Sequence, residues 1–155
     1  MYVEHYFRQV LNQFISSMEL KFDIDGGDFS KAGFASSEVK KVLKQLNLAP
    51  ALIRRMAVAM YEAEVNIVAH ANRGTMWVSI EADRVKMVFN DEGPGIEDIS
   101  KAMTEGYSTA SDEVRQMGFG AGMGLPNINR NADDFKISSE VNKGTRLEIT
   151  TFLKK

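Results

Sequence analysis

The chain has 155 residues, no cysteine, and 19 basic against 21 acidic residues, which give a formal net charge of −2. This length predicts a single domain, and the lack of cysteine excludes a disulfide framework and a thiolate metal site. The balanced charge argues against nucleic-acid binding, and no apolar run reaches the ~20 residues of a membrane span. We therefore expect a cytoplasmic protein that binds neither nucleic acid nor membrane.

An amphipathic helix is predicted at the N-terminus, over residues 3–18. The apolar residues that recur there at helical spacing are Val3, Tyr6, Phe7, Val10, Leu11, Phe14, Ile15 and Met18. So wide a stripe packs either on its own domain or on a partner helix. We treat residues 1–19 as a separate segment. If its helix packs on a partner helix, it would support a homodimer.

The remainder of the chain, residues 20–155, contains both helical and strand patterns. The predicted helices span 29–46, 50–72 and 126–132, and the last two open with a proline. The predicted strands span 21–25, 75–81, 84–90, 135–141 and 146–152, and the last four form two hairpins. Helices gather early and strands late, which is typical of an α+β sandwich.

The helix over 50–72 carries a polar stripe. Glu62, Asn66 and His70 are four residues apart, so they lie on one face of a largely apolar helix. A carboxylate there loses hydration, which hydrogen bonds or a cation must replace. Alternatively, Glu62 faces solvent on a narrow strip, as we expect of Glu64. Asn66 offers a neutral oxygen to Mg²⁺, which prefers a few protein oxygens with water and phosphate.

A glycine turn follows the strand over 84–90. Asp91 at the strand end can accept a hydrogen bond from an exocyclic amine, and Gly93 and Gly95 let a flat ring lie against the backbone. The alternative is a β-turn that uses Asp and Gly for their turn propensity. The pair Gly144-Thr145 is by itself no more than a hairpin turn.

Four glycines alternate with other residues in MGFGAGMGLPNI, at positions 118, 120, 122 and 124. Because glycine loses the most conformational freedom on folding, the segment requires bare backbone. It is either a flexible connector or a loop whose N–H groups approach an anion. Met123 and Leu125 stand where dinucleotide-binding or protein-kinase motifs would need glycine, and no Gly-Lys pair exists for a Walker A loop. Any ligand must therefore be bound by another scheme.

Taken in order, these motifs resemble the N, G1, G2 and G3 boxes of the GHKL nucleotide-binding superfamily. They are Glu62-x-x-x-Asn66, Asp91-x-Gly93-x-Gly95, the glycines at 118–124, and Gly144-Thr145. Within the superfamily, residues 20–153 are most similar to the small bacterial anti-sigma factors and stress-switch serine kinases, notably in AEVNIVAHAN, GYSTAS and SEVNKGT. The resemblance implies a two-layer sandwich of the histidine-kinase-like ATPase type. Its sheet would be mixed, mostly antiparallel, and covered by helices on one face.

The resemblance also implies roles for individual residues. Glu62 would be the general base and Asn66 the Mg²⁺ ligand. Asp91 would read adenine, with Thr145 as a supporting polar contact, and the alternating glycines would form an ATP lid. The implied ATP-binding residues are Asn66, Asp91, Gly93, Gly95, Ile96, Thr109, Gly118, Gly120, Gly122, Gly124, Leu125 and Thr145.

The implied function is that of an ATP- and Mg²⁺-dependent serine/threonine protein kinase in a partner-switching pathway. Its substrate would be a small antagonist protein that bears the acceptor serine or threonine. One alternative is a nucleotide-gated binding module that sequesters a sigma factor or another regulator, such as a phosphatase regulator, without significant kinase activity. A second alternative is a detached histidine-kinase catalytic domain. Only His5 and His70 could serve as its acceptor, and His5 lacks the downstream proline of a phospho-acceptor helix.

Overall fold

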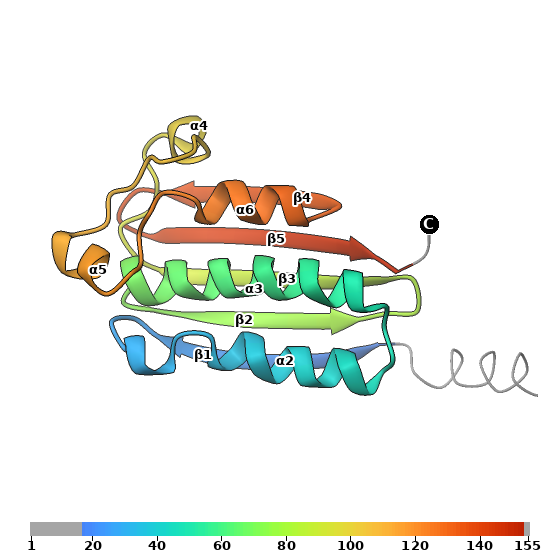
Figure 1. The fold of residues 1–155 in the computed structure, drawn as a ribbon. Helices are drawn as coiled ribbons and strands as arrows, with labels where there is room; N and C mark the ends of the chain where they lie inside the picture. The colour runs from blue at the N-terminus through green and yellow to red at the C-terminus, as the bar shows by residue number, and fades with distance from the viewer. Residues whose placement is uncertain (1–16, 154–155) are drawn as a thin grey trace, which may run out of the picture.

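The computed structural model describes residues 17–153, which form two layers (Figure 1). One layer is a five-stranded sheet, and the other consists of the longer helices, which lie on one face of the sheet. The strands are β1 (Met18–Asp25), β2 (Arg73–Ile80), β3 (Arg84–Glu92), β4 (Asp134–Glu140) and β5 (Gly144–Phe152). The helices are η1 (Phe29–Lys31), α2 (Phe34–Gln45), α3 (Pro50–His70), α4 (Ile99–Ala102), α5 (Asp112–Gln116) and α6 (Gly124–Asn131).

The sheet has the strand order β1-β2-β3-β5-β4, and its four pairings are all antiparallel. The expected α+β sandwich is confirmed, but the sheet is not mixed as expected, because every pairing within the described residues is antiparallel. Both predicted hairpins are present, as β2 with β3 and β4 with β5. Because β3 pairs with β5, Asn90 near the end of β3 lies opposite Arg146 near the start of β5. This pairing brings the Asp91 turn next to Gly144-Thr145.

The core lies between the sheet and the helical layer. Its largest side chains include Met56, Met60, Ile67, Met76, Met87, Phe89 and Ile149, each at most 2% exposed. Burying a side chain of this kind contributes roughly 1.5–3 kcal/mol to stability. The core therefore fixes α3 firmly over the middle of the sheet, and with it the polar side chains that α3 carries.

The predicted helix over 29–46 is interrupted in the structure. A 3-10 turn, η1, and α2 are separated by Ala32 and Gly33, and Gly33 has a φ of 88° in the left-handed region. A Cβ at Gly33 would also lie 3.0 Å from the Tyr61 ring. Helical spacing missed the break because Phe29, Ala32 and Ala35 keep a three-residue interval through it.

Other boundaries also differ from the sequence prediction. β1 begins at Met18, so the last residue assigned to the N-terminal helix is in a strand and pairs with Ile80. The rest of that predicted helix, apart from Ser17, lies outside the described residues. α6 begins at Gly124, two residues before Pro126. The short helices α4 and α5 were not predicted.

Candidate functional site

Asp91 lies where β3 ends beside the start of β5. Its Oδ1 accepts a hydrogen bond from the Thr145 backbone N–H at 3.1 Å. A Cβ on Gly93 or Gly144 would approach the same oxygen to 3.1 or 3.0 Å, so both glycines let the backbone close around it. Burial raises the pKa of the Asp91 carboxyl, and the Thr145 hydrogen bond acts in the opposite direction. Oδ1 is thus held by the protein, whereas Oδ2 has no hydrogen-bond partner within residues 17–153.

Ser139 connects the loop after β3 with the β4–β5 hairpin. Its Oγ accepts a hydrogen bond from the Ile96 backbone N–H at 2.8 Å, and it lies 3.0 Å from the Gly144 carbonyl oxygen and 2.8 Å from Thr145 Oγ1. Gly95 allows the close approach, because a Cβ there would lie 2.3 Å from a backbone oxygen of β4. Gly95, Ile96 and Thr145, which were predicted separately, therefore belong to one cluster with Asp91.

Glu62 and Asn66 converge on the first residue of α6. A Cβ on Gly124 would lie 3.2 Å from Asn66 Oδ1 and 3.4 Å from Glu62 Oε2. Both side chains belong to half-buried residues, and the adjoining Leu125 is buried and anchors α6 in the core. The structure thus brings Glu62, Asn66, Gly124 and Leu125 together as a second cluster, between α3 and α6.

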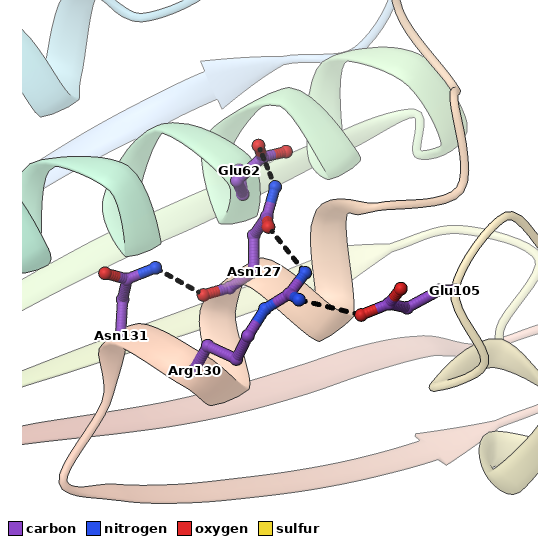
Figure 2. A network of polar contacts seen from close by, with 5 residues as sticks. All are labelled: Glu62, Glu105, Asn127, Arg130 and Asn131. Atoms are coloured by element: carbon purple, nitrogen blue, oxygen red, sulfur yellow. Dashed lines mark hydrogen bonds and ion pairs between the residues drawn. The ribbon is translucent and has the colours of Figure 1, made fainter.

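A network of polar contacts surrounds Glu62 (Figure 2). Asn127 Nδ2 donates to Glu62 Oε1 at 3.1 Å, and Asn127 Oδ1 accepts a hydrogen bond from Arg130 Nη2 at 3.1 Å. Arg130 Nη1 also donates to Glu105 Oε1 at 2.7 Å, and Asn131 Nδ2 donates to the Asn127 carbonyl oxygen at 2.9 Å. The network joins α3, α6 and the segment that follows α4.

Glu64 is not the exposed neighbour that the sequence analysis expected. Its side chain is only 2% exposed, and its carboxylate accepts the backbone N–H groups of Ala35 at 3.1 Å and Ser36 at 2.9 Å, together with the Ser36 hydroxyl. These N–H groups open α2, whose N-cap residue Gly33 has no side chain to satisfy them. Glu64 therefore caps α2 from a neighbouring helix, while Glu62 is the carboxylate that faces the site.

The alternating glycines connect α5 to α6. Gly118, Gly120 and Gly122 have φ angles of 87°, 77° and 76°, a region that costs other residues about 1 kcal/mol or more. The Gly106 N–H donates to the Gly122 carbonyl oxygen at 2.9 Å, which ties the two ends of the segment 106–122 together. A Cβ on Gly122 would lie 2.4 Å from the Gly106 carbonyl carbon. The segment is thus a closed loop whose shape requires glycine at its base.

Two further contacts define this loop. The ring of Phe119 packs on that of Phe29 in η1, with centroids 5.1 Å apart. Thr109, expected at the nucleotide, lies in the same loop with an exposed side chain. No described hydrogen bond joins Thr109 to Asp91 or Glu62, so its predicted role stays a prediction.

The site offers few ligands of its own to a metal ion. No group of three or more His, Asp or Glu side chains within residues 17–153 is arranged to hold one. An ion at Asn66 would need additional oxygens from phosphate and water, and Mg²⁺ prefers this kind of coordination. The donor set at Glu62 and Asn66 therefore fits Mg²⁺ bound together with a phosphate ligand.

Among the described helices, none is long and apolar enough to cross a membrane.

Residues 31–151 match the family model of the histidine kinase-like ATPase domain. The chain belongs to this family. It is similar to the serine/threonine-protein kinase RsbT of Bacillus subtilis, with 32% identity over 74% of this chain and 84% of that protein. It is also similar to the anti-sigma F factor of Caldanaerobacter subterraneus, with 30% identity over 91% of this chain and 96% of the relative. The anti-sigma F factor of Clostridium acetobutylicum is 32% identical over 85% of this chain and 90% of its own length.

A solved structure has the same fold as this histidine kinase-like ATPase. It is a chain in the crystal structure of the SiaB-SiaC complex from Pseudomonas aeruginosa, with a TM-score of 0.60 over 97% of this chain and 98% of that chain. The sequence identity is 13%, so the likeness concerns the fold alone.

Two residues of the site were not predicted from the sequence of this histidine kinase-like ATPase. Asn127 lies three residues after Gly124, so helical spacing places both on one side of α6, but only once the helix is known to begin at Gly124. Ser139 reaches Ile96 across 43 residues, and no local spacing marks such a contact.

Proposed function

We propose that this histidine kinase-like ATPase is an ATP- and Mg²⁺-dependent serine/threonine protein kinase of a partner-switching pathway, acting in the cytoplasm. The observation that carries the proposal is the convergence of Glu62, Asn66 and Gly124 beside a closed glycine loop. Its protein substrate would be a small antagonist that presents a serine or threonine hydroxyl. The relationship to RsbT and to anti-sigma F factors supports this substrate class.

Adenine would be bound by the Asp91 cluster. Because Thr145 holds Oδ1 of Asp91, Oδ2 can accept a hydrogen bond from the exocyclic amine of adenine. Guanine carries a carbonyl oxygen at the equivalent ring position, and it would leave the carboxylate without a donor. Gly93, Gly95 and Ile96 would form the backbone surface beside the base. This arrangement supports a preference for ATP over GTP.

The phosphates would lie between α3 and the glycine loop. The N–H groups at the glycine-rich start of α6 suit phosphate oxygens, because a helix N-terminus offers unpaired donors and a favourable dipole. The loop residues Gly118, Gly120 and Gly122 would close over them as a lid. Mg²⁺ bound at Asn66 would neutralise negative charge on the phosphates.

Glu62 would act as the general base. Its Oε2, which faces Asn66 and Gly124, would accept the proton of the substrate hydroxyl. The hydroxyl oxygen then bonds to the γ-phosphorus, the bond from that phosphorus to the bridging oxygen breaks, and its electron pair leaves with ADP. Glu64 cannot replace Glu62, because both oxygens of Glu64 are engaged in capping α2.

The variant Glu62→Gln tests this function. Glutamine keeps the side chain's size and an oxygen that can accept from Asn127, but it cannot take a proton at neutral pH. We expect transfer to the antagonist protein to fall by about 10²- to 10⁴-fold, the usual contribution of a positioned general base. ATP affinity should change by less than about ten-fold. Glu19→Gln, the same change at an exposed residue of β1, is the matched control. A normal transfer rate in Glu62→Gln would overturn the assignment of the base.

The second candidate is a nucleotide-gated module that sequesters a sigma factor. The similarity to anti-sigma F factors over most of the chain favours it. Capture of purified sigma factors with ATP, ADP or no nucleotide distinguishes the two. ATP-dependent capture by a protein that transfers no phosphate to any serine or threonine acceptor would support the binding module.

A further inference from the structure

The network around Glu62 assigns a role to a residue that none of the sequence motifs contains. We propose that Asn127 is a positioning residue, which holds Oε1 of Glu62 and so leaves Oε2 to accept the substrate proton. Arg130 and Glu105 fix the direction of the Asn127 amide. The inference rests on the proposed function of Glu62.

The orientation of the Asn127 amide follows from its two partners. Arginine can only donate hydrogen bonds, so the atom of Asn127 that faces Arg130 is the carbonyl oxygen. An ionised carboxylate can only accept them, so the atom that faces Glu62 is the amide nitrogen. Both partners demand the same orientation, and a reversed amide would lose both hydrogen bonds. Arg130 therefore keeps the amide nitrogen of Asn127, which is the hydrogen-bond donor, directed at Glu62.

The hydrogen bond from Asn127 makes the two oxygens of Glu62 unequal. Oε1 accepts from Asn127 Nδ2 at 3.1 Å. Oε2 has no hydrogen-bond partner within residues 17–153, and it lies on the side of Asn66 and Gly124. A carboxylate that rotates freely would offer either oxygen in many directions. One fixed oxygen aims the remaining lone pairs at the space where the substrate hydroxyl must arrive.

Arg130 is held in turn by Glu105. Their side chains are 52% and 60% exposed, so the ion pair itself adds little to stability. Its effect is geometric, because it restrains the guanidinium next to Asn127. Glu105 immediately precedes Gly106, whose N–H donates to the Gly122 carbonyl oxygen at the base of the glycine loop. The position of Glu62 is thereby linked to both ends of the loop.

Asn127→Ala tests the role of the amide. Alanine favours the helix, so α6 should fold. We expect kcat for phosphoryl transfer to fall by about ten-fold or more, as for loss of a hydrogen bond to a charged group, while ATP affinity stays within about two-fold. Asn129→Ala, on the exposed side of the same helix, is the matched control and should leave both quantities unchanged. An unchanged kcat in Asn127→Ala would overturn the proposal.

Asn127→Asp distinguishes the effect of the hydrogen-bond donor from the effect of the side chain's size. Aspartate has the same size and can still accept from Arg130, but it presents an oxygen to Glu62 in place of the N–H. At saturating ATP, we expect kcat to fall at least as far as in Asn127→Ala, whereas Asn129→Asp should behave like the unmodified protein. A kcat in Asn127→Asp close to that of the unmodified protein would show that the donor is not needed.

A double-variant cycle tests whether Asn127 acts through Glu62. With Glu62→Gln already present, adding Asn127→Ala should change the remaining transfer rate by less than about two-fold. An equal fall in both backgrounds would mean that Asn127 acts elsewhere, and it would overturn the inference while leaving Glu62 as the base. If Glu62→Gln alone transfers phosphate normally, it is the proposed function that fails.

A measurement without nucleotide checks the network directly. In NMR spectra of the full chain, Arg130→Ala and Glu62→Gln should each shift the side-chain amide signal of Asn127 and leave that of Asn129 in place. If neither variant moves the Asn127 signal, the two hydrogen bonds do not persist in solution and the proposal is wrong.

Discussion

The backbone N–H of Thr145 donates to Oδ1 of Asp91 at 3.1 Å, although 54 residues separate them in sequence. This contact fixes a half-buried carboxylate, and the other oxygen of Asp91 has no hydrogen-bond partner within residues 17–153. Removing the charge should affect ligand binding and stability in opposite directions.

Asp91→Asn should weaken ATP binding by more than about ten-fold. Asparagine keeps an oxygen for the Thr145 N–H, but it lacks the negative charge that would attract the adenine amine. A hydrogen bond to a charged group contributes about 1.5 to 3 kcal/mol. Calorimetric titration with ATP and GTP measures the effect. Equal affinity of the unmodified protein for the two nucleotides would contradict the adenine-reading role.

The same variant should stabilise the protein without nucleotide. Burial raises the pKa of Asp91 in the folded state, so the folded protein binds this proton more tightly than the unfolded chain does. The resulting stability is fully present below the unfolded pKa and is lost as the pH rises through the folded pKa. At about pH 7, Asp91→Asn should therefore have the higher Tm, and the difference should shrink toward about pH 4. Thermal unfolding monitored by circular dichroism tests this, and a lower Tm for Asp91→Asn at neutral pH would refute it.

Asn66→Ala should lower both ATP affinity and phosphoryl transfer, whereas Glu62→Gln should lower mainly phosphoryl transfer. Because Asn66 would supply the protein's oxygen to Mg²⁺, its loss should reduce Mg²⁺-dependent ATP affinity and phosphoryl transfer together. ATP binding measured in the presence of a chelator should be nearly the same in Asn66→Ala and in the unmodified protein. A large fall in affinity without Mg²⁺ would indicate a role in packing instead.

Glu64→Ala should destabilise the fold by about 2–4 kcal/mol, because it leaves the first N–H groups of α2 buried without an acceptor. Glu64→Gln retains one acceptor oxygen and should lose less. Urea unfolding of both variants provides the measurement, with Glu62→Gln as the control at the half-buried neighbour. Similar unfolding free energies for Glu64→Ala and the unmodified protein would be incompatible with the capping role.

Gly122→Ala and Gly118→Ala form a matched pair in the loop between α5 and α6. Both residues have positive φ, so both variants carry similar backbone strain. Of these two residues, only Gly122 would place its Cβ against another segment, at 2.4 Å from the Gly106 carbonyl carbon, whereas Gly118 has open space around it. We expect Gly122→Ala to weaken ATP binding by about ten-fold or more, and Gly118→Ala to have a much smaller effect. Calorimetry on the two variants would contradict this reading of the loop if the order were reversed.

The sequence by itself determined the main elements and the motif order. The alternation in β2 and β3 and the apolar periodicity of α3 depend on how side chains point along one element, and local spacing records that direction. Glycine turns marked the Asp91 loop and the loop over residues 118–124, because few other residues adopt those conformations. The motif order then led to the family, which the match over residues 31–151 confirms.

Only the tertiary structure decided which carboxylate serves which purpose. Glu62 and Glu64 are two residues apart on one helix, but they have different partners. Glu64 accepts hydrogen bonds from backbone N–H groups at the start of α2, 28 or 29 residues away, whereas Glu62 accepts one from Asn127, 65 residues away. Periodicity gives the direction of a side chain but not what packs opposite it. The partners of Glu62, Glu64 and Ser139 depend on how whole elements pack across the core, and no local pattern encodes that arrangement.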